Sequence, residues 1–466
     1  MKIVNTALLC ALTVVASATL SNAQTRIYFN GSTAFRGAAE PQIKALFDSS
    51  PAVVFGYSKT SESGANAQIF SGYIGGVPYI IKASWTGSES GLQAIVADSG
   101  TGVAINFIAD VPALTAGGTT TLTTGGTPNL LDPTTVTGSD SRLESHVPDV
   151  AFSDTYQTSS QFYPGNKIKY GSPLKFHTMG TATAVTTGST GGAIGDGIVG
   201  IIPFVFATTS TAFTNIDTSA IVNLYAYLGG VAPRSMFTGV VSDTNAHVYA
   251  TGRNPDSGTR LNAMVNNTLS SVQAVTQFEP VDSTNTLISA TGSTIASIRP
   301  WDADTVNTIA IPQGNSGYNS GGSLAGALGS VTSGMVAYSA TGSILTNGTN
   351  GDIVAYLGVS DFTKSTFPIA GGQGGGQMLS FNGVPYSRQA VEQGLYKFWG
   401  YEHIYVNPLS AAPALTQANR IASALVSGTT VVQAGGLDAT DSLANMKVSR
   451  SGSDKDGQPI TFFYTY

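Results

Sequence analysis

Residues 246–265 read AHVYATGRNPDSGTRLNAMV, and this stretch decides the fold class. A short apolar segment leads into a turn that contains Ser257-Gly258-Thr259. Leu261, Met264 and Val265 then follow at helical spacing. Apolar residues at positions i, i+3 and i+4 after a short strand indicate a β-strand followed by an α-helix.

The same unit occurs twice more. Residues 25–47, TRIYFNGSTAFRGAAEPQIKALF, place a Gly-Ser-Thr turn before Ile43, Leu46 and Phe47. Residues 79–98, YIIKASWTGSESGLQAIVAD, place Gly87-Ser88 before Leu92, Ile95 and Val96. Repeated βα units predict an α/β protein.

Length and charge limit the class of protein further. The chain has 466 residues and is 42% hydrophobic, which is more than one core usually holds, so we expect two lobes or more. Charged residues make up only 10%, and the net charge is −6. A nucleic-acid partner is not expected on that balance.

The first residues resemble a secretory signal. Lys2 precedes an apolar run, and Ser21-Asn22-Ala23 fits the small-residue cleavage rule. We expect residues 1–23 to be removed and the protein to be periplasmic or secreted. The mature chain would carry 20 basic and 27 acidic residues, a net charge of −7, and no cysteine, because Cys10 is the only one. No other apolar run predicts a membrane helix.

Thr/Gly-rich segments lie between the units. Residues 114–141 and 178–193 show no periodicity, and we expect surface excursions there. Residues 371–377, GGQGGGQ, are typical of a flexible loop near a domain crossing.

Three of the turns have the chemistry of an anion site, because helix N-termini present unpaired N–H groups and Ser or Thr adds hydroxyl donors. They are Ser32-Thr33-Ala34, Gly87-Ser88 and Ser257-Gly258-Thr259. A fourth segment, residues 147–157, places Ser153-Asp154 at the end of an apolar strand. Taken singly, each is more typical of a helix cap or a local turn.

Together these segments resemble the phosphate-binding protein of bacterial phosphate ABC transporters, a periplasmic-binding-protein fold of the second type. RNPDSGT (253–259) is similar to the family's arginine loop, GSESGLQAI (87–95) to its second turn, AFSD (151–154) to its Ser-Asp and GSTAF (31–35) to its first turn. The order along the chain also agrees.

The resemblance implies a phosphate-binding set that draws on all four segments. Its members are Ser32, Thr33, Ala34, Ser88, Asp154, Arg253, Ser257, Gly258 and Thr259. Arg253 would make charge-assisted bonds to the anion. The family often has an aspartate two residues after this arginine, where this chain has Pro255. Asp256 is one candidate to take over its role; otherwise the geometry of Arg253 differs.

Asp154 fits an anion site once protons are counted. Monohydrogen phosphate can donate a proton to a buried carboxylate, whereas sulfate cannot and would be repelled. The set therefore predicts selection of phosphate or another protonated oxyanion, such as arsenate. The alternative is that Asp154 only caps the next helix.

The resemblance implies two lobes with an interlobe cleft: 24–205 with 376–466, and 206–375. The leading interpretation is an exported solute-binding protein that delivers phosphate to an ABC-transporter permease. The alternative is an extracellular surface or matrix protein on the same fold. We expect no enzyme and no cofactor, because His146, His177, His247 and His403 have no metal-binding spacing and no G-x-S-x-G motif occurs.

Overall fold

The computed structural model describes residues 24–96, 103–110, 121–136, 139–161, 180–181, 185–186, 193–194, 197–306, 309–338, 343–346, 351–363, 375–407, 409–426, 445–450 and 456–462. The expected signal at 1–23 lies outside the described residues, as do parts of both Thr/Gly-rich excursions and of the loop at 371–377. Within the described ranges, no helix is long and apolar enough to cross a membrane.

One large mixed sheet forms the centre of the molecule. Its strands follow the order β13 (Val231–Pro233), β14 (His247–Ala250), β21 (Gly351–Gly358), β11 (Ile198–Thr208), β24 (Trp399–Val406), β7 (Val150–Ser153), β1 (Thr25–Gly31), β4 (Val77–Ser84), β3 (Ala67–Ile74) and β2 (Val54–Tyr57). Off this path, β22 (Gln377–Met378) pairs with β11, and β8 (Gly180–Thr181) pairs with β24. The predicted α/β class is confirmed.

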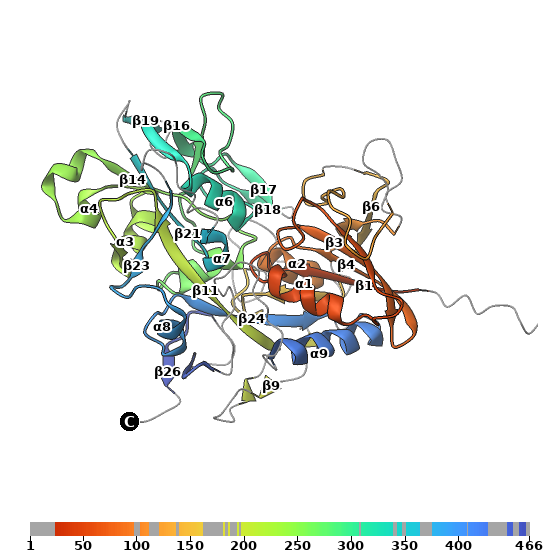
Figure 1. Cartoon of the computed structure of the whole chain (residues 1–466). Coiled ribbons are helices and arrows are strands. Elements are labelled where there is room, and N and C mark those ends of the chain that lie inside the picture. The colour runs from red at the N-terminus through yellow and green to blue at the C-terminus, as the bar shows by residue number, and fades with distance from the viewer. Residues whose placement is uncertain are drawn as a thin grey trace, which may run out of the picture.

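Strand β11 joins two parts of this sheet. Residues 198–203 pair with β24, and residues 204–208 pair with β21. We call β24, β7, β1, β4, β3 and β2 the first half-sheet, and β21, β14 and β13 the second half-sheet. In Figure 1 the red and orange N-terminal elements, which include β1, β3 and β4 of the first half-sheet, lie on the right, and the green elements lie on the left, on the side of β14 and β21. The predicted lobe boundaries at 205 and 376 stay a prediction.

Each of the three sequence units forms a strand followed by a helix. α1 (Arg36–Ala45) follows β1, α2 (Ser88–Val96) follows β4, and α5 (Gly258–Val265) follows β14. The apolar positions at helical spacing face the interior: Ile43, Leu92 and Met264 are buried. Burial of one helical face against the sheet is what selects this structure.

One large hydrophobic cluster extends through both half-sheets. It includes Phe29 and Phe152 of the first half-sheet and Tyr356 of the second, with Phe206 on β11 between them. Helix α9 (Ala412–Val426) contacts α1, β11 and β24. The two halves therefore share a buried core along β11 and β24.

The remaining elements cover the edges and ends of the sheet. The helices are α3 (Thr218–Val222), a π-helix (Asn223–Tyr227), α4 (Ser235–Thr238), a 3-10 helix (Val241–Asn245), α6 (Gly321–Leu328), α7 (Val359–Phe362) and α8 (Arg388–Glu392). The smaller sheets pair β5 (Ile105–Ile108) with β6 (Leu143–His146), β9 (Val185–Thr186) with β10 (Ala193–Ile194), β12 (Asn215–Ile216) with β23 (Ser380–Phe381), β17 (Asp304–Val306) with β18 (Ile309–Ile311), and β25 (Val448–Arg450) with β26 (Ile460–Phe462). A further sheet has the order β15 (Phe278–Val281), β16 (Thr294–Pro300), β19 (Val331–Tyr338) and β20 (Ile344–Thr346).

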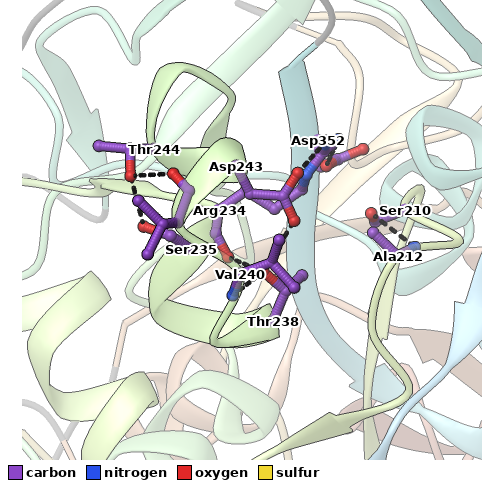
Figure 2. A network of polar contacts seen from close by, with 10 residues as sticks. Ser210, Ala212, Arg234, Ser235, Thr238, Val240, Asp243, Thr244 and Asp352 are labelled. Atoms are coloured by element: carbon purple, nitrogen blue, oxygen red, sulfur yellow. Dashed lines mark hydrogen bonds and ion pairs between the residues drawn. The ribbon is translucent and has the colours of Figure 1, made fainter.

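A charged network fixes the outer end of the second half-sheet. Figure 2 shows Arg234 between Asp243 and Asp352, with Nη2–Oδ1 and Nη1–Oδ2 distances of 2.8 and 3.4 Å. The Thr238 hydroxyl donates to Asp243 at 2.8 Å. Asp352 lies at the start of β21, so the network ties the start of α4 and the 3-10 helix to this strand of the sheet.

Candidate functional site

The predicted turns of the first half-sheet meet because their strands are parallel. β1 runs parallel to both β4 and β7, so the carboxyl ends of the three strands lie at one edge. Thr33, Ser88 and Asp154 follow these ends directly. In open α/β sheets, ligands bind beyond the carboxyl ends of the strands.

The second half-sheet brings its arginine loop to the same place. Residues 253–259 follow β14, which runs parallel to β21. The Nη2 atom of Arg253 lies 3.5 Å from the Thr33 hydroxyl oxygen. We call Thr33, Ser88, Asp154, Arg253 and Gly258 the four-loop cluster. The structure brings these five residues together from four distant parts of the chain.

Asp154 and Gly258 are in close contact across the cluster. A Cβ atom placed on Gly258 would lie 1.5 Å from Oδ1 of Asp154 and 2.8 Å from Cβ of Ser88. Only a glycine leaves space for this approach. The Asp154 backbone N–H donates to the Ser88 hydroxyl oxygen at 3.3 Å.

The Asp154 carboxyl group is buried, with 1% of the residue exposed, and its Oδ1 atom has no hydrogen-bond partner among the described residues. Burial raises the pKa of Asp154 to about 6. A hydrogen bond from the Ser88 side chain to the carboxyl group and the charge of Arg253 act in the opposite direction. No helix begins within residues 154–161, which form turns, so Asp154 is not a helix cap. A free acceptor oxygen in a buried site suits a ligand that donates a proton.

Arg253 is buried and held by carbonyl groups. Its Nε donates to the Tyr318 carbonyl and its Nη2 to the Asn319 carbonyl, both at 3.1 Å. The carbonyl of Arg253 in turn accepts from Arg260 at 3.3 Å and from Gln277 at 3.1 Å. Both ends of the residue are therefore fixed before any ligand binds.

The charges of two buried carboxylates, Asp361 and Asp154, act on Arg253. Burial lowers the pKa of Arg253, and the charges of Asp361 and Asp154 raise it. Asp361 also acts on Arg36, whose pKa is lowered chiefly by burial. The backbone carbonyl of Asp256 accepts from the Glu89 N–H at 3.0 Å. A steadying role of Asp256 toward Arg253 stays a prediction.

The other predicted residues lie around the cluster in different roles. The Ser32 N–H donates to the Phe152 carbonyl at 2.8 Å, and its hydroxyl accepts from the Phe35 N–H, so its amide is already used. The Ser257 hydroxyl caps α5 by accepting from the Arg260 N–H at 3.3 Å. Thr259 is buried at the start of α5, and Ala34 is half-buried near Gly358.

Three hydrogen bonds close the two half-sheets against each other at this point. The Asn262 side chain donates to the Asp154 carbonyl at 2.7 Å. The Gln161 side chain donates to the Pro255 carbonyl at 2.8 Å. The third bond is donated by the Glu89 N–H to the Asp256 carbonyl. The described conformation is therefore one in which the four loops contact one another.

Glu402 is a residue that the sequence prediction missed. It lies on β24, is fully buried, and neither carboxyl oxygen has a hydrogen bond of good geometry to a described residue. Burial and the charge of Asp154 raise the pKa of Glu402 well above its usual range, against a lowering effect of Ser32. The sequence feature that could have pointed to Glu402 is a single carboxylate inside the apolar segment WGYEHIYV (399–406).

The cluster has the chemistry of an anion site rather than of a metal site. It combines one guanidinium, two hydroxyl groups, two helix starts and one acceptor carboxylate. In the part of the chain that the structure describes, no group of three or more His, Cys, Asp or Glu residues could hold a metal ion.

Comparison with known proteins finds matches only among solved structures. No family model and no curated protein matches the chain. A candidate phosphate ABC transporter substrate-binding protein with bound phosphate, from Clostridium perfringens, is 10% identical, with a TM-score of 0.37 over 86% of this chain and 97% of that one. An ABC-type phosphate transport receptor from Vibrio cholerae is 9% identical, with a TM-score of 0.29 over 59% of this chain and 74% of that one.

PstS from Borrelia burgdorferi is also 9% identical, with a TM-score of 0.29 over 85% of this chain and 92% of that one. Similarities at this level assign no ligand to this chain.

Proposed function

We propose that this protein captures phosphate, or a similar protonated oxyanion, at the four-loop cluster. The observation that carries the proposal is the unpartnered, buried Oδ1 atom of Asp154, set against the start of α5 and in the field of Arg253. Hydroxyl, guanidinium and helix N–H groups donate to the anion. Asp154 accepts the one proton that the anion carries.

The biological role that fits this site is solute capture outside the cytoplasm, with delivery to an ABC-transporter permease. Binding would hold the two half-sheets together, since the anion would be contacted from both sides. The protein would act without catalysis. An extracellular surface or matrix role on the same fold is the alternative, and phosphate binding separates the two.

Titration calorimetry of phosphate against the wild type and Arg253→Ala tests the proposal. Hydrogen bonds to charged groups are worth about 1.5–3 kcal/mol each. The variant should therefore bind phosphate roughly tenfold to more than a hundredfold more weakly. Arg253→Lys keeps the charge but loses the planar fork, and its affinity should lie between the two.

Arg142→Ala is the matched control, because Arg142 pairs with Asp140 away from the cluster. It should bind phosphate like the wild type. Thermal unfolding of each variant shows whether it is folded. Unchanged phosphate binding in a folded Arg253→Ala protein would place the ligand elsewhere, and absence of binding in the wild type would favour the surface role.

A further inference from the structure

A polar pocket adjoins the four-loop cluster. Its volume is about 340 Å³, and both half-sheets contribute to its walls. Pockets for small organic molecules have volumes of about 300–1,000 Å³. The space therefore exceeds the needs of a single tetrahedral oxyanion.

The pocket and the cluster meet at Thr33, which belongs to both. Thr86 and Ser90, which line the pocket, are sequence neighbours of Ser88 on either side, and Asn254 lines it next to Arg253. We expect a group attached to one oxygen of an anion at the cluster to extend past Thr33 into this pocket.

The walls carry polar atoms that lack partners. Ser84 Oγ, Thr86 Oγ1 and Asn254 Oδ1 are buried and make no hydrogen bond to any residue that the structure describes. Ser84 itself is only 1% exposed. Buried polar groups are nearly always hydrogen-bonded in folded proteins, and leaving one unpaired costs about 1–3 kcal/mol. Each of these three side chains therefore has hydrogen-bonding capacity left for a hydroxyl group of a ligand.

The charge of the pocket limits what it can accept. Among the described residues that line it, there is no lysine or arginine, and Asp256 is the one carboxylate. A second phosphate group would find no cationic side chain of these residues to balance its charge. An uncharged group rich in hydroxyls needs no such balancing charge.

From this geometry we propose that the protein binds phosphate monoesters of small polyols, with the phosphoryl group at the four-loop cluster and the hydroxyl groups in the adjoining pocket. The proposal deepens the proposed function and rests on it. It adds a ligand class, since inorganic phosphate alone would leave the pocket unused.

The proton on the phosphoryl group sets the conditions of the test. A phosphate monoester loses its second proton at about pH 6, and burial raises the pKa of Asp154 to about 6. At about that pH, one proton is available between the carboxyl group and the ester. Binding should therefore be measured there, for the ester and for inorganic phosphate alike.

Titration calorimetry with glycerol 3-phosphate, inorganic phosphate, pyrophosphate and glycerol tests the ligand class. Glycerol 3-phosphate should bind about tenfold more tightly than inorganic phosphate, the gain expected from one or two added hydrogen bonds. Pyrophosphate should bind more weakly than either, and glycerol alone should show no heat of binding at millimolar concentration.

Variants of the pocket wall test where the ester lies. Thr86→Val and Asn254→Ala should each weaken glycerol 3-phosphate binding about threefold to tenfold and leave inorganic phosphate binding unchanged. Asn106→Trp, from a half-buried wall position on β5, should fill the pocket and abolish only the ester's advantage.

The outcomes separate the two proposals. Binding of inorganic phosphate without binding of glycerol 3-phosphate would overturn the ester inference and leave the proposed function standing. Wall variants that weaken the binding of both ligands equally would also overturn the ester inference and leave the proposed function standing. If neither ligand binds the wild type, the proposed function itself is wrong, and the ester inference is wrong with it.

Discussion

At the scale of single residues, the proposed function makes Asp154 the residue that selects the anion. Its buried carboxylate would accept a proton from monohydrogen phosphate and repel sulfate, which has none to give. Asp154→Asn keeps the size but removes the charge and adds a donor. The variant should lose some phosphate affinity and admit sulfate better, as measured by competition of sulfate against labelled phosphate at one pH and ionic strength.

Glu402→Gln is the matched control for this experiment. Glu402 is a second buried carboxyl group close to the cluster, and burial favours its uncharged form. The substitution should therefore leave the discrimination against sulfate intact. If sulfate competes equally well against the wild type and Asp154→Asn, Asp154 does not recognise the proton and the ligand could be any small oxyanion.

The residues of the cluster differ in how far the sequence could predict them. Ser88, Arg253 and Gly258 lie in short Gly/Ser segments at helix starts, where local chemistry already suggests donors. Asp361 and the carbonyls of Tyr318 and Asn319 support Arg253 from about 65 to 108 positions away, as their numbering shows. No local pattern encodes such a partner, because tertiary packing alone brings it there.

At the scale of elements, Gly258 determines how closely α5 can approach the first half-sheet. Gly258→Ala would place a Cβ 1.5 Å from Asp154 Oδ1 and 2.8 Å from Cβ of Ser88, and rotation of the Asp154 side chain would not relieve the second contact. The start of the helix and Asp154 must then move apart. Phosphate affinity, measured by calorimetry, should fall by at least tenfold, while the free energy of unfolding should change less than for a core substitution.

Gly37→Ala provides the control for that substitution. Gly37 lies in α1, and a Cβ there would meet no atom within 4 Å. Alanine is favoured over glycine inside a helix by about 1 kcal/mol. This variant should be slightly more stable and bind phosphate normally. Normal binding by Gly258→Ala as well would show that the close contact is not needed for the ligand.

The helices and strands themselves could be predicted best from the sequence. Strand-turn-helix periodicity predicted β1–α1, β4–α2 and β14–α5, because apolar spacing reports directly on which face is buried. The pairing order of the strands was not predictable in the same way. β24 lies between β7 and β11 although hundreds of residues separate it from β7 in sequence, a non-local pairing that no window of sequence contains.

At the scale of the whole molecule, the site depends on how two half-sheets share one framework. β11 pairs with β24 along one part and with β21 along the other, so the halves are joined by continuous strands as well as by the cluster. Asn262, Gln161 and Glu89 add hydrogen bonds between the two halves next to the four-loop cluster. Ligand contacts from both sides would therefore add to contacts that already exist.

Buried carboxyl groups make the stability of this framework depend on pH. Burial raises the pKa of Asp154 to about 6 and those of Glu89 and Asp456 to about 7. In the unfolded chain such groups titrate near pH 4. Between about pH 4 and 7 the folded protein therefore binds more protons than the unfolded one, and its stability falls as the pH rises.

The free energy of unfolding should accordingly decrease between pH 5 and 8, on the order of a few kcal/mol, when measured by urea denaturation in phosphate-free buffer. Glu89→Gln and Asp456→Asn should each flatten this dependence, because each removes one group with a raised pKa. Asp140→Asn is the control: Arg142 holds the pKa of Asp140 at about 2, so its contribution is lost only as the pH falls below 4. A stability that rises from pH 5 to 8, or an equal flattening by all three substitutions, would mean that these carboxyl groups are not buried in solution as they are in the structure.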